Sequence, residues 1–576
     1  MVFEERLSPA RVSAAAAAKL PRMVLLALIV AYIVSGLFGR DPWQEDDATG
    51  FGVMWTMAHG SQWLLPAVAG ERVAADGPLA YWAGAAAIAA AGPLLGDVAA
   101  ARLPIVLWFF LATAALWYGT LELARRDEAQ PVAFAFGGEA TRRDYGRMLA
   151  DVAVLLLLGT IGPVVTLHET TAEPAAFALQ CTVLYGLALS PQRPQAGAAI
   201  AGVALGLFWL ARGAQPGLWL ALGGIAAVAT AAPTAARGRA AALLVASALG
   251  VVAAWMAAVV GVHGETGQAY LADWATESLR RFAWPQVESA AWLLRTLPWH
   301  TWPLWPLAAW AVYAWRHGIG RPHIAVGLWL LIAHLFAVLV TPAPSADDLL
   351  FVVPPLVLLA AFGAVALRRA AENVIDWFAV TAFCLFSVAL WAYFFAMHAG
   401  VPPKMSASVL RLTAGFVPPL DAARVAVAAA ATAFWIGLVI WRVRQPAAPL
   451  WRGPALAATG LVTLWVTFSM LFLSAVDHRR SFAAVARTVA SEMAQAGASA
   501  ADCVLAHQLR PSHLAVFAYH GRIRFGGGDC AFALHRDMAG SLLDDMPPPG
   551  QWAQVWAGHR PGLPHEVIRL YRRTSD

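Results

Sequence analysis

The stretch "MVLLALIVAYIVSGLFGRDPWQEDD" (residues 23–47) decides the fold class, because a long apolar segment runs directly into three consecutive carboxylates. The apolar part, residues 23–38, contains no charged side chain and is typical of a helix that crosses a bilayer. The whole chain of 576 residues has a similar character, being 60% hydrophobic and only 13% charged. A soluble protein of this length needs a more charged surface, so we predict an all-α polytopic membrane protein.

The N-terminal flank of this segment is basic. Arg6, Arg11, Lys19 and Arg22 all precede it, and a charged loop follows it instead of a small-residue cleavage site. We therefore interpret residues 23–38 as an uncleaved first span and not as a signal peptide. Because cytoplasmic ends collect Lys and Arg, the N-terminus is predicted to be cytoplasmic.

Apolar segments long enough to cross a bilayer, about 20 residues each, recur along the chain. They predict about thirteen transmembrane helices, at 23–38, 101–124, 149–167, 172–190, 197–212, 214–231, 241–262, 299–315, 324–342, 350–367, 374–397, 421–441 and 455–474.

Loop arginines predict the topology of these spans. The loop that contains Arg125, Arg126, Arg142 and Arg143 is strongly basic and should lie on the same side as the N-terminus. The Ala- and Gly-rich segment 79–96 is then an interfacial or re-entrant helix. The alternative, in which 79–96 is a fourteenth span, would turn the most basic loops outward. We expect a multi-pass protein of the bacterial inner membrane.

The chain changes character at its C-terminal end. Residues 1–476 are predicted to form the transmembrane domain, and residues 477–576 a soluble periplasmic α/β domain with an amphipathic helix at 477–493. Cys503 and Cys530 lie in this second domain. We predict that they form a disulfide, because the periplasm is oxidising and the closed loop would stabilise the fold by about 3–4 kcal/mol. Two buried free thiols are the alternative.

Chemistry-bearing residues gather in three outer loops. The first holds Asp46 among its carboxylates, the second holds His168 and Glu169, and the third holds Arg280 and Arg281. A carboxylate can take a proton from an attacking acceptor, and an arginine can neutralise a departing phosphate. The set therefore favours group transfer from a lipid phosphate. The alternatives are a solvated helix start for Asp46 and lipid-headgroup contact for the two arginines. A transporter would instead place ionisable residues within its spans.

The segment "DPWQEDDATGFGVMWTMAHGSQWLLPAVAGERVAADGPLAYW" (41–82) resembles the first outer loop of bacterial aminoarabinose transferases. These are GT-C glycosyltransferases related to protein O-mannosyltransferases. The resemblance puts Asp46 on the catalytic aspartate, Glu169 on a second acid, and Arg281, in "ESLRRFA" (277–283), on the arginine that meets the donor phosphate. "LPW" (297–299) and "LLFVVPPLVLLA" (349–360) resemble later landmarks of the family.

The chain departs from the family at three places. Asp76 stands where the family has a phosphate-binding lysine, Asp347 replaces a basic residue, and Thr49–Gly50 replaces Arg-Tyr. The resemblance therefore implies a general class and no particular sugar or acceptor.

That class is an inverting GT-C glycosyltransferase that moves a sugar from a polyprenyl-phosphate donor to an envelope acceptor, which would be a lipid A-like glycolipid, a glycan or a protein. Its catalytic residues would be Asp46 and Glu169, with Arg281 and Arg280 at the donor phosphate. The candidate substrate-binding residues are Asp47, His168, Asp76, Tyr81, Trp82 and Asp347. The alternatives are a degenerate relative that binds or transports lipid-linked sugars, and an envelope scaffold.

Few further partners follow from the sequence. The expected partners are membrane lipids, the donor and the acceptor. The net charge of +5 comes mainly from loop arginines and implies no nucleic acid. No cofactor is required by the sequence. The acidic site could hold a divalent metal, although no ligand spacing demands one. We expect a monomer.

Overall fold

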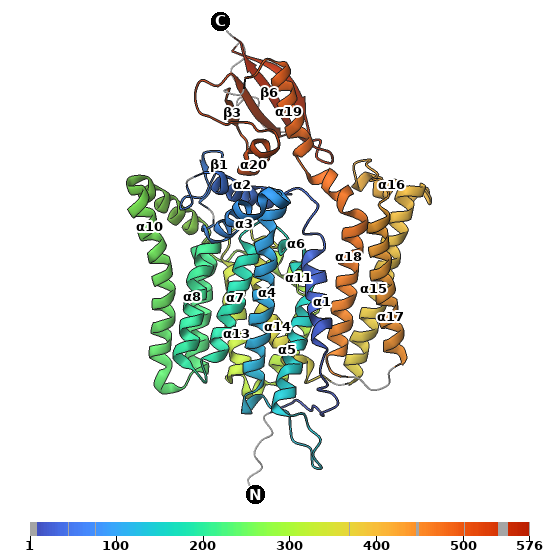
Figure 1. Ribbon diagram of the computed structural model, residues 1–576. Coiled ribbons are helices and arrows are strands. Elements are labelled where there is room, and N and C mark those ends of the chain that lie inside the picture. Colours follow the sequence, from blue (N-terminus) through green and yellow to red (C-terminus); the bar gives the residue numbers. More distant parts are fainter. Residues whose placement is uncertain are drawn as a thin grey trace.

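The computed structural model describes residues 8–43, 45–60, 62–74, 76–367, 369–444, 449–499, 502–538 and 551–574. A bundle of long helices carries a small C-terminal α/β region at one end (Figure 1). This arrangement confirms the predicted all-α polytopic class with a small C-terminal α/β part.

Eight helices within the described residues are long and apolar enough to cross a membrane. They are α4 (Asp97–Ala124), α8 (Pro194–Arg212), α9 (Ala214–Ala231), α10 (Arg237–Arg280), α13 (Pro322–Leu339), α15 (Arg369–Ala399), α17 (Ala422–Arg444) and α18 (Arg452–Arg480). Shorter bundle helices are α1 (Arg22–Val34), α5 (Arg142–Leu158), α6 (Pro163–Thr166), α7 (Glu173–Leu189), α11 (Val287–His300), α12 (Leu304–Ala314) and α14 (Val353–Ala364). Short 3-10 turns are η1 (Asp127–Ala129), η2 (Thr234–Ala236), η3 (Arg316–Gly318) and η4 (Asp348–Val352). Each predicted span falls on one of these helices, while the number of crossings stays a prediction.

The predicted loop after residue 262 is helical and corrects the sequence interpretation. α10 bends at Gly264, where φ is 55°, and continues to Arg280. Beyond the bend, Gly267, Tyr270, Trp274 and Ser278 are buried at helical spacing while the other face is exposed. A search for continuous apolar runs cannot detect such an amphipathic helix.

Two further helices lie between the bundle and the C-terminal region (Figure 1). α2 (Glu45–His59) and α3 (Leu79–Leu95) pack against each other, joined through the short hairpin of β1 (Ala67–Val68) and β2 (Glu71–Arg72). α3 covers most of segment 79–96, for which we predicted an interfacial or re-entrant helix. Its position beside α2 is compatible with that prediction.

Glycines let α2 approach its neighbours closely. A Cβ atom at Gly50 would overlap the carbonyl oxygen of Thr170, and one at Gly52 would overlap the side chain of Ala515. α2 is therefore held between the loop before α7 on one side and α20 on the other.

The C-terminal region is a four-stranded sheet with two helices. Its strands β3 (Val504–His507), β4 (Phe532–Met538), β5 (Trp552–Gly558) and β6 (Glu566–Arg573) lie in the order β3-β4-β6-β5, and only β3 and β4 are parallel. The helices are α19 (Ala483–Gln495) and α20 (Pro511–His520). The structure pairs Cys503 and Cys530 in a disulfide. The amphipathic helix begins at Ala483 and not at 477, because α18 continues to Arg480.

A buried carboxylate fixes the start of α2. Asp47 is fully buried and pairs with Arg40 at 2.8 Å and with Arg102 at 3.7 Å. It also accepts hydrogen bonds from the backbone N–H and the hydroxyl of Thr170, both at 2.6 Å, and from the backbone N–H of Trp43 at 2.7 Å. One side chain thus joins the end of the first span, α2, α4 and the loop before α7.

We expect Asp47→Ala to lower the free energy of unfolding by about 3–5 kcal/mol, because it leaves two buried guanidinium groups without their main partner. The neighbouring Asp46→Asn should change it by no more than about 0.5 kcal/mol, because that side chain is exposed. Thermal unfolding of the purified proteins in the same detergent measures the difference. Equal midpoints for the two variants would contradict the anchoring role.

Candidate active site

Six segments of the chain bring carboxyl and guanidinium groups together beneath α2. They are the start of α2, the loop before α3, and the loop before α7 together with Glu173, the first residue of that helix. The other three are the C-terminal end of α8, the C-terminal end of α10, and the loop 343–348. We call the resulting set the carboxylate–arginine cluster. Its members are Asp46, Asp76, Glu169, Glu173, Asp347, Asp348, Arg212 and Arg281.

Asp46 is an accessible carboxylate in the first turn of α2. Successive helical residues point about 100° apart, so Asp46 is exposed while Asp47 is buried. Surrounding protein raises the pKa of Asp46, and the negative charges of Asp76 and Asp347 raise it further, while Arg212 and Arg281 oppose them. A carboxylate with a raised pKa holds a proton more firmly and is therefore a stronger general base when ionised.

Arg212 is the centre of the charge network. Its Nη1 lies 2.9 Å from Asp76, its Nε lies 3.0 Å from Glu173, and its Nη2 lies 3.7 Å from Asp348. Arg281 approaches the same Asp76 oxygen at 3.5 Å. Asp76 therefore lies between two guanidinium groups, which is a position that an anion of a ligand could also take.

Glu169 and Asp347 complete the cluster. Thr166 donates a hydrogen bond to Asp347 at 2.9 Å. Glu169 is only 8% exposed, and its Oε1 has no hydrogen-bond partner among the described residues. Burial and then the negative charge of Asp47 raise the pKa of Glu169 well above its usual range. The neutral form is favoured, so this side chain can donate a hydrogen bond as well as accept one.

Several predicted site residues lie elsewhere. Asp47 is enclosed by its anchoring contacts. His168 is 2% exposed, packs against Tyr32 and Trp465, and has its pKa lowered to about 4, first by burial. Neither side chain presents a surface to a substrate. Arg280 is not part of the cluster, since its side chain is 73% exposed and its ion pair among the described residues is with Glu277, at 3.4 Å.

Tyr81 and Trp82, which the sequence predicted as substrate-binding residues, have packing roles in α3. Tyr81 is 3% exposed and packs in the core beneath α2, and Trp82 donates a hydrogen bond to the Trp63 carbonyl oxygen at 2.6 Å. They hold α3 against the first loop.

The sequence interpretation missed Arg212, Glu173 and Asp348. One signal was available for Arg212, which follows a span whose end is predicted to face outward. An arginine there runs against the tendency of Lys and Arg to collect in cytoplasmic loops. Such an exception indicates a specific role for the charge.

A metal ion remains only a sequence-based hypothesis. Among the residues that the structure describes, no group of three or more His, Cys, Asp or Glu side chains is arranged to hold one.

A second cavity, of about 1080 Å³, lies on the opposite face of α2 from Asp46. It opens beside the contact between α2 and α20. Trp55, His59 and Tyr519 line it together with charged groups such as Arg522. Trp55 makes edge-on contact with Tyr519, and its Nε1 donates to Asp97 at 3.2 Å. This cavity is therefore separate from the carboxylate–arginine cluster, none of whose members lines it.

Comparisons with known proteins place the fold. No protein-family profile matches the sequence, and no curated protein matches it. Among solved structures, ArnT from Cupriavidus metallidurans bound to undecaprenyl phosphate superposes with a TM-score of 0.64 at 15% identity, over 95% of this chain and 97% of that chain. ArnT in the apo state gives 0.63 at 15% identity, over the same shares. The chain thus has a GT-C glycosyltransferase-like fold, as the sequence resemblance implied.

Proposed function

We propose that this protein is an inverting membrane glycosyltransferase that moves a sugar from a polyprenyl-phosphate donor to an envelope acceptor. The acceptor would be a lipid A-like glycolipid, a glycan or a protein. The observation that carries the proposal is the accessible Asp46 facing two arginines, Arg212 and Arg281, that already share one anion. The fold adds support, because the similar ArnT was crystallised with undecaprenyl phosphate bound.

The proposed reaction is a single displacement. Asp46 takes the proton of an acceptor hydroxyl as its oxygen forms a bond to the anomeric carbon of the sugar. The bond from that carbon to the phosphate oxygen breaks, and the lipid phosphate leaves with the electron pair. Arg281 and Arg212 then stabilise the charge that develops on the phosphate.

Asp76 sets a condition on donor binding. It accepts contacts from both arginines, so a donor phosphate must displace it or share their N–H groups. In the family that the sequence resembles, a lysine stands here. In this chain Arg212 supplies a positive charge from a different segment.

Glu169 is assigned a positioning role. Its buried carboxyl group, whose pKa is raised, lies in the same cluster as Asp46, where its protonated form can donate a hydrogen bond to a sugar or phosphate oxygen.

The second candidate function is binding of lipid-linked sugars without catalysis. It is favoured by the excess of carboxyl groups, since Asp76 and Asp347 replace basic residues of the related family. Loss of transfer activity in the Asp46→Asn variant described below would favour catalysis over binding alone.

The proposed orientation places the cluster and the C-terminal region in the periplasm and the N-terminus in the cytoplasm of a bacterial inner membrane. We expect a topology reporter fused at Gly138 to give a cytoplasmic signal, because arginines crowd this loop. A periplasmic signal from that fusion would overturn the orientation.

We expect Asp46→Asn to reduce transfer by roughly 10² or more, because the amide keeps the shape but cannot act as a base. Glu45→Gln is the matched control, as an exposed carboxylate of the same helical turn. Mass spectrometry of envelope glycolipids, glycans and glycoproteins should show a modification that is lost on deletion of the protein and restored by wild type and by the control.

The same assay decides against the proposal in two ways. Full restoration of the modification by Asp46→Asn would remove Asp46 as the base. A modification restored by neither wild type nor variant would favour the non-catalytic candidate.

We expect activity to fall as the pH drops through the raised pKa of Asp46, since only the ionised form accepts a proton. Asp76→Asn removes a neighbouring negative charge and frees both arginines, so the pKa of Asp46 decreases and the acid limb moves to lower pH. The pH profile of kcat at saturating donor measures this shift. Asp273→Asn, an exposed carboxylate of α10, should leave the limb in place, and an unshifted limb in Asp76→Asn would contradict the coupling.

A further inference from the structure

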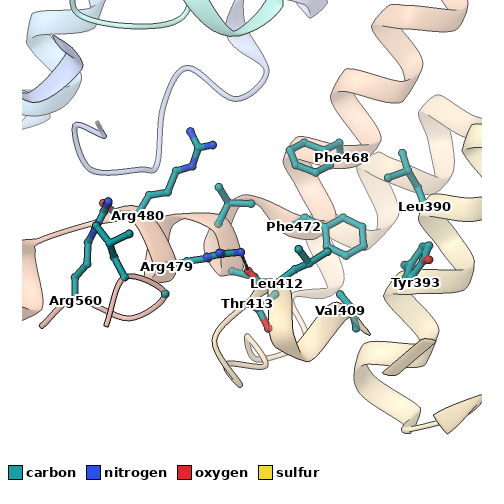
Figure 2. Close-up of a pocket in the computed structure, with 14 residues that line it drawn as sticks. Leu390, Tyr393, Val409, Leu412, Thr413, Phe468, Phe472, Arg479, Arg480 and Arg560 are labelled. Carbon is teal, nitrogen blue, oxygen red and sulfur yellow. Dashed lines mark hydrogen bonds between the residues drawn. The ribbon is translucent and has the colours of Figure 1, made fainter. Parts of the chain in front are cut away.

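An amphipathic pocket lies on the periphery of the bundle, apart from the carboxylate–arginine cluster. Its volume is about 580 Å³, and it is formed by α15, α16 (Pro403–Leu412), the end of α18 and the loop before β6. Figure 2 shows the two chemical halves of this pocket. The rings of Phe468 and Phe472 and the side chain of Leu390 lie on one side, and Arg479, Arg480 and Arg560 lie on the other.

The three arginines form a positive cluster without carboxylate partners. Arg479 donates to the Leu412 carbonyl oxygen at 2.8 Å, and Arg560 donates to the Arg480 carbonyl oxygen at 2.8 Å. None of the three makes an ion pair with a carboxylate among the described residues. The Nε of Arg560 is buried and has no partner among them. Burial lowers the pKa of Arg560, and Arg480 and Arg479 lower it further, while the negative charge of Glu566 opposes them.

The position of the pocket suits a lipid. Arg479 and Arg480 occupy the last turn of the apolar helix α18, where the hydrophobic surface of the bundle ends. Large apolar side chains of α15, such as Leu385, Phe386 and Val388, are more than half exposed, so this side of the bundle faces acyl chains in a membrane.

We propose that this pocket binds an anionic diacyl phospholipid. The arginines hold the headgroup phosphate by charge-assisted hydrogen bonds, and an acyl chain packs against Phe468 and Phe472. A free phosphate would leave the apolar half unfilled, and a zwitterionic lipid would bring its own cation to the arginines. The donor has a separate proposed phosphate position at Arg281 and Arg212.

The bound lipid would touch the segment that leads to Asp46. The guanidinium group of Arg480 lies 5.5 Å from the centre of the Trp43 ring. The guanidinium group of Arg40 lies 4.2 Å from the centre of the same ring. The same segment is tied to α18, because Asp477 accepts hydrogen bonds from the Trp43 side chain at 2.6 Å and from the Asp41 backbone at 2.9 Å. Arg480 therefore connects the lipid pocket to the first loop.

The test is native mass spectrometry of the delipidated full-length protein with dioleoyl phosphatidylglycerol, dioleoyl phosphatidylethanolamine or undecaprenyl phosphate. We expect one phosphatidylglycerol to bind at least tenfold more tightly than phosphatidylethanolamine. The double variant Arg479→Gln/Arg560→Gln should weaken this binding about tenfold or more, since each arginine near a membrane surface contributes about 1 kcal/mol. Lys404→Gln/Arg411→Gln is the matched control, with the same loss of charge on exposed positions of α16 outside the pocket.

Thermal unfolding shows that each variant is folded before its binding is compared. Leu412→Glu, which places a negative charge in the mouth of the pocket, should also weaken phosphatidylglycerol binding. Equal binding of the two phospholipids, preferential binding of undecaprenyl phosphate that the arginine variant abolishes, or equal weakening by the control variant would each overturn the proposal. Displacement of the phospholipid by inorganic phosphate at equal concentration would overturn the role of the apolar half.

Discussion

The buried carboxylate of Asp47 is the constraint on which the candidate site depends. Two guanidinium groups and three further donor groups converge on it from segments that are distant in sequence. A charge in this interior is stable only while those partners remain, so the start of α2 has one allowed position. That position turns Asp46 toward Arg212 and Arg281. Glu45, at the start of the same helix, pairs with Arg510 of the C-terminal region.

Adjacent carboxylates acquire different roles from their surroundings. Asp47 has a lowered pKa despite its burial, because Arg40, Arg102 and Thr170 stabilise the charged form. Asp46 has a raised pKa, because the surrounding protein desolvates it and the negative charges of Asp76 and Asp347 add to this effect, while Arg212 and Arg281 oppose it. Glu169 lacks such partners and favours its neutral form. Three neighbouring acids thus have different surroundings, which suit the anchoring contacts of Asp47 and the roles proposed above for Asp46 and Glu169.

The sequence predicted the fold class well and the site only in part. Spans were predictable because backbone groups in a bilayer must pair within helices, which leaves a strong hydropathy signal. The continuation of α10 was missed because one of its faces is polar. Asp46 was distinguished from Asp47 only through the family resemblance, and the anchoring contacts of Asp47 were not foreseen, since they depend on helix phase and on partners such as Arg102 and Thr170. His168 was predicted as a candidate substrate-binding residue, although packing against Tyr32 and Trp465 makes it an interior residue.

Arg212 shows why a motif that lacks its usual residue is weak evidence for loss of function. A donor phosphate needs positive charge at a place in space, whichever segment supplies it. In the family that the sequence resembles, a lysine in the loop before α3 supplies this positive charge. This chain has Asp76 at that place. Here the end of α8 brings a guanidinium group to within 2.9 Å of that same position. The substitution of lysine by aspartate therefore does not remove the positive charge. Under the proposed function, an incoming donor phosphate would displace Asp76 or share its arginines, so donor affinity would depend on the balance between these two anions.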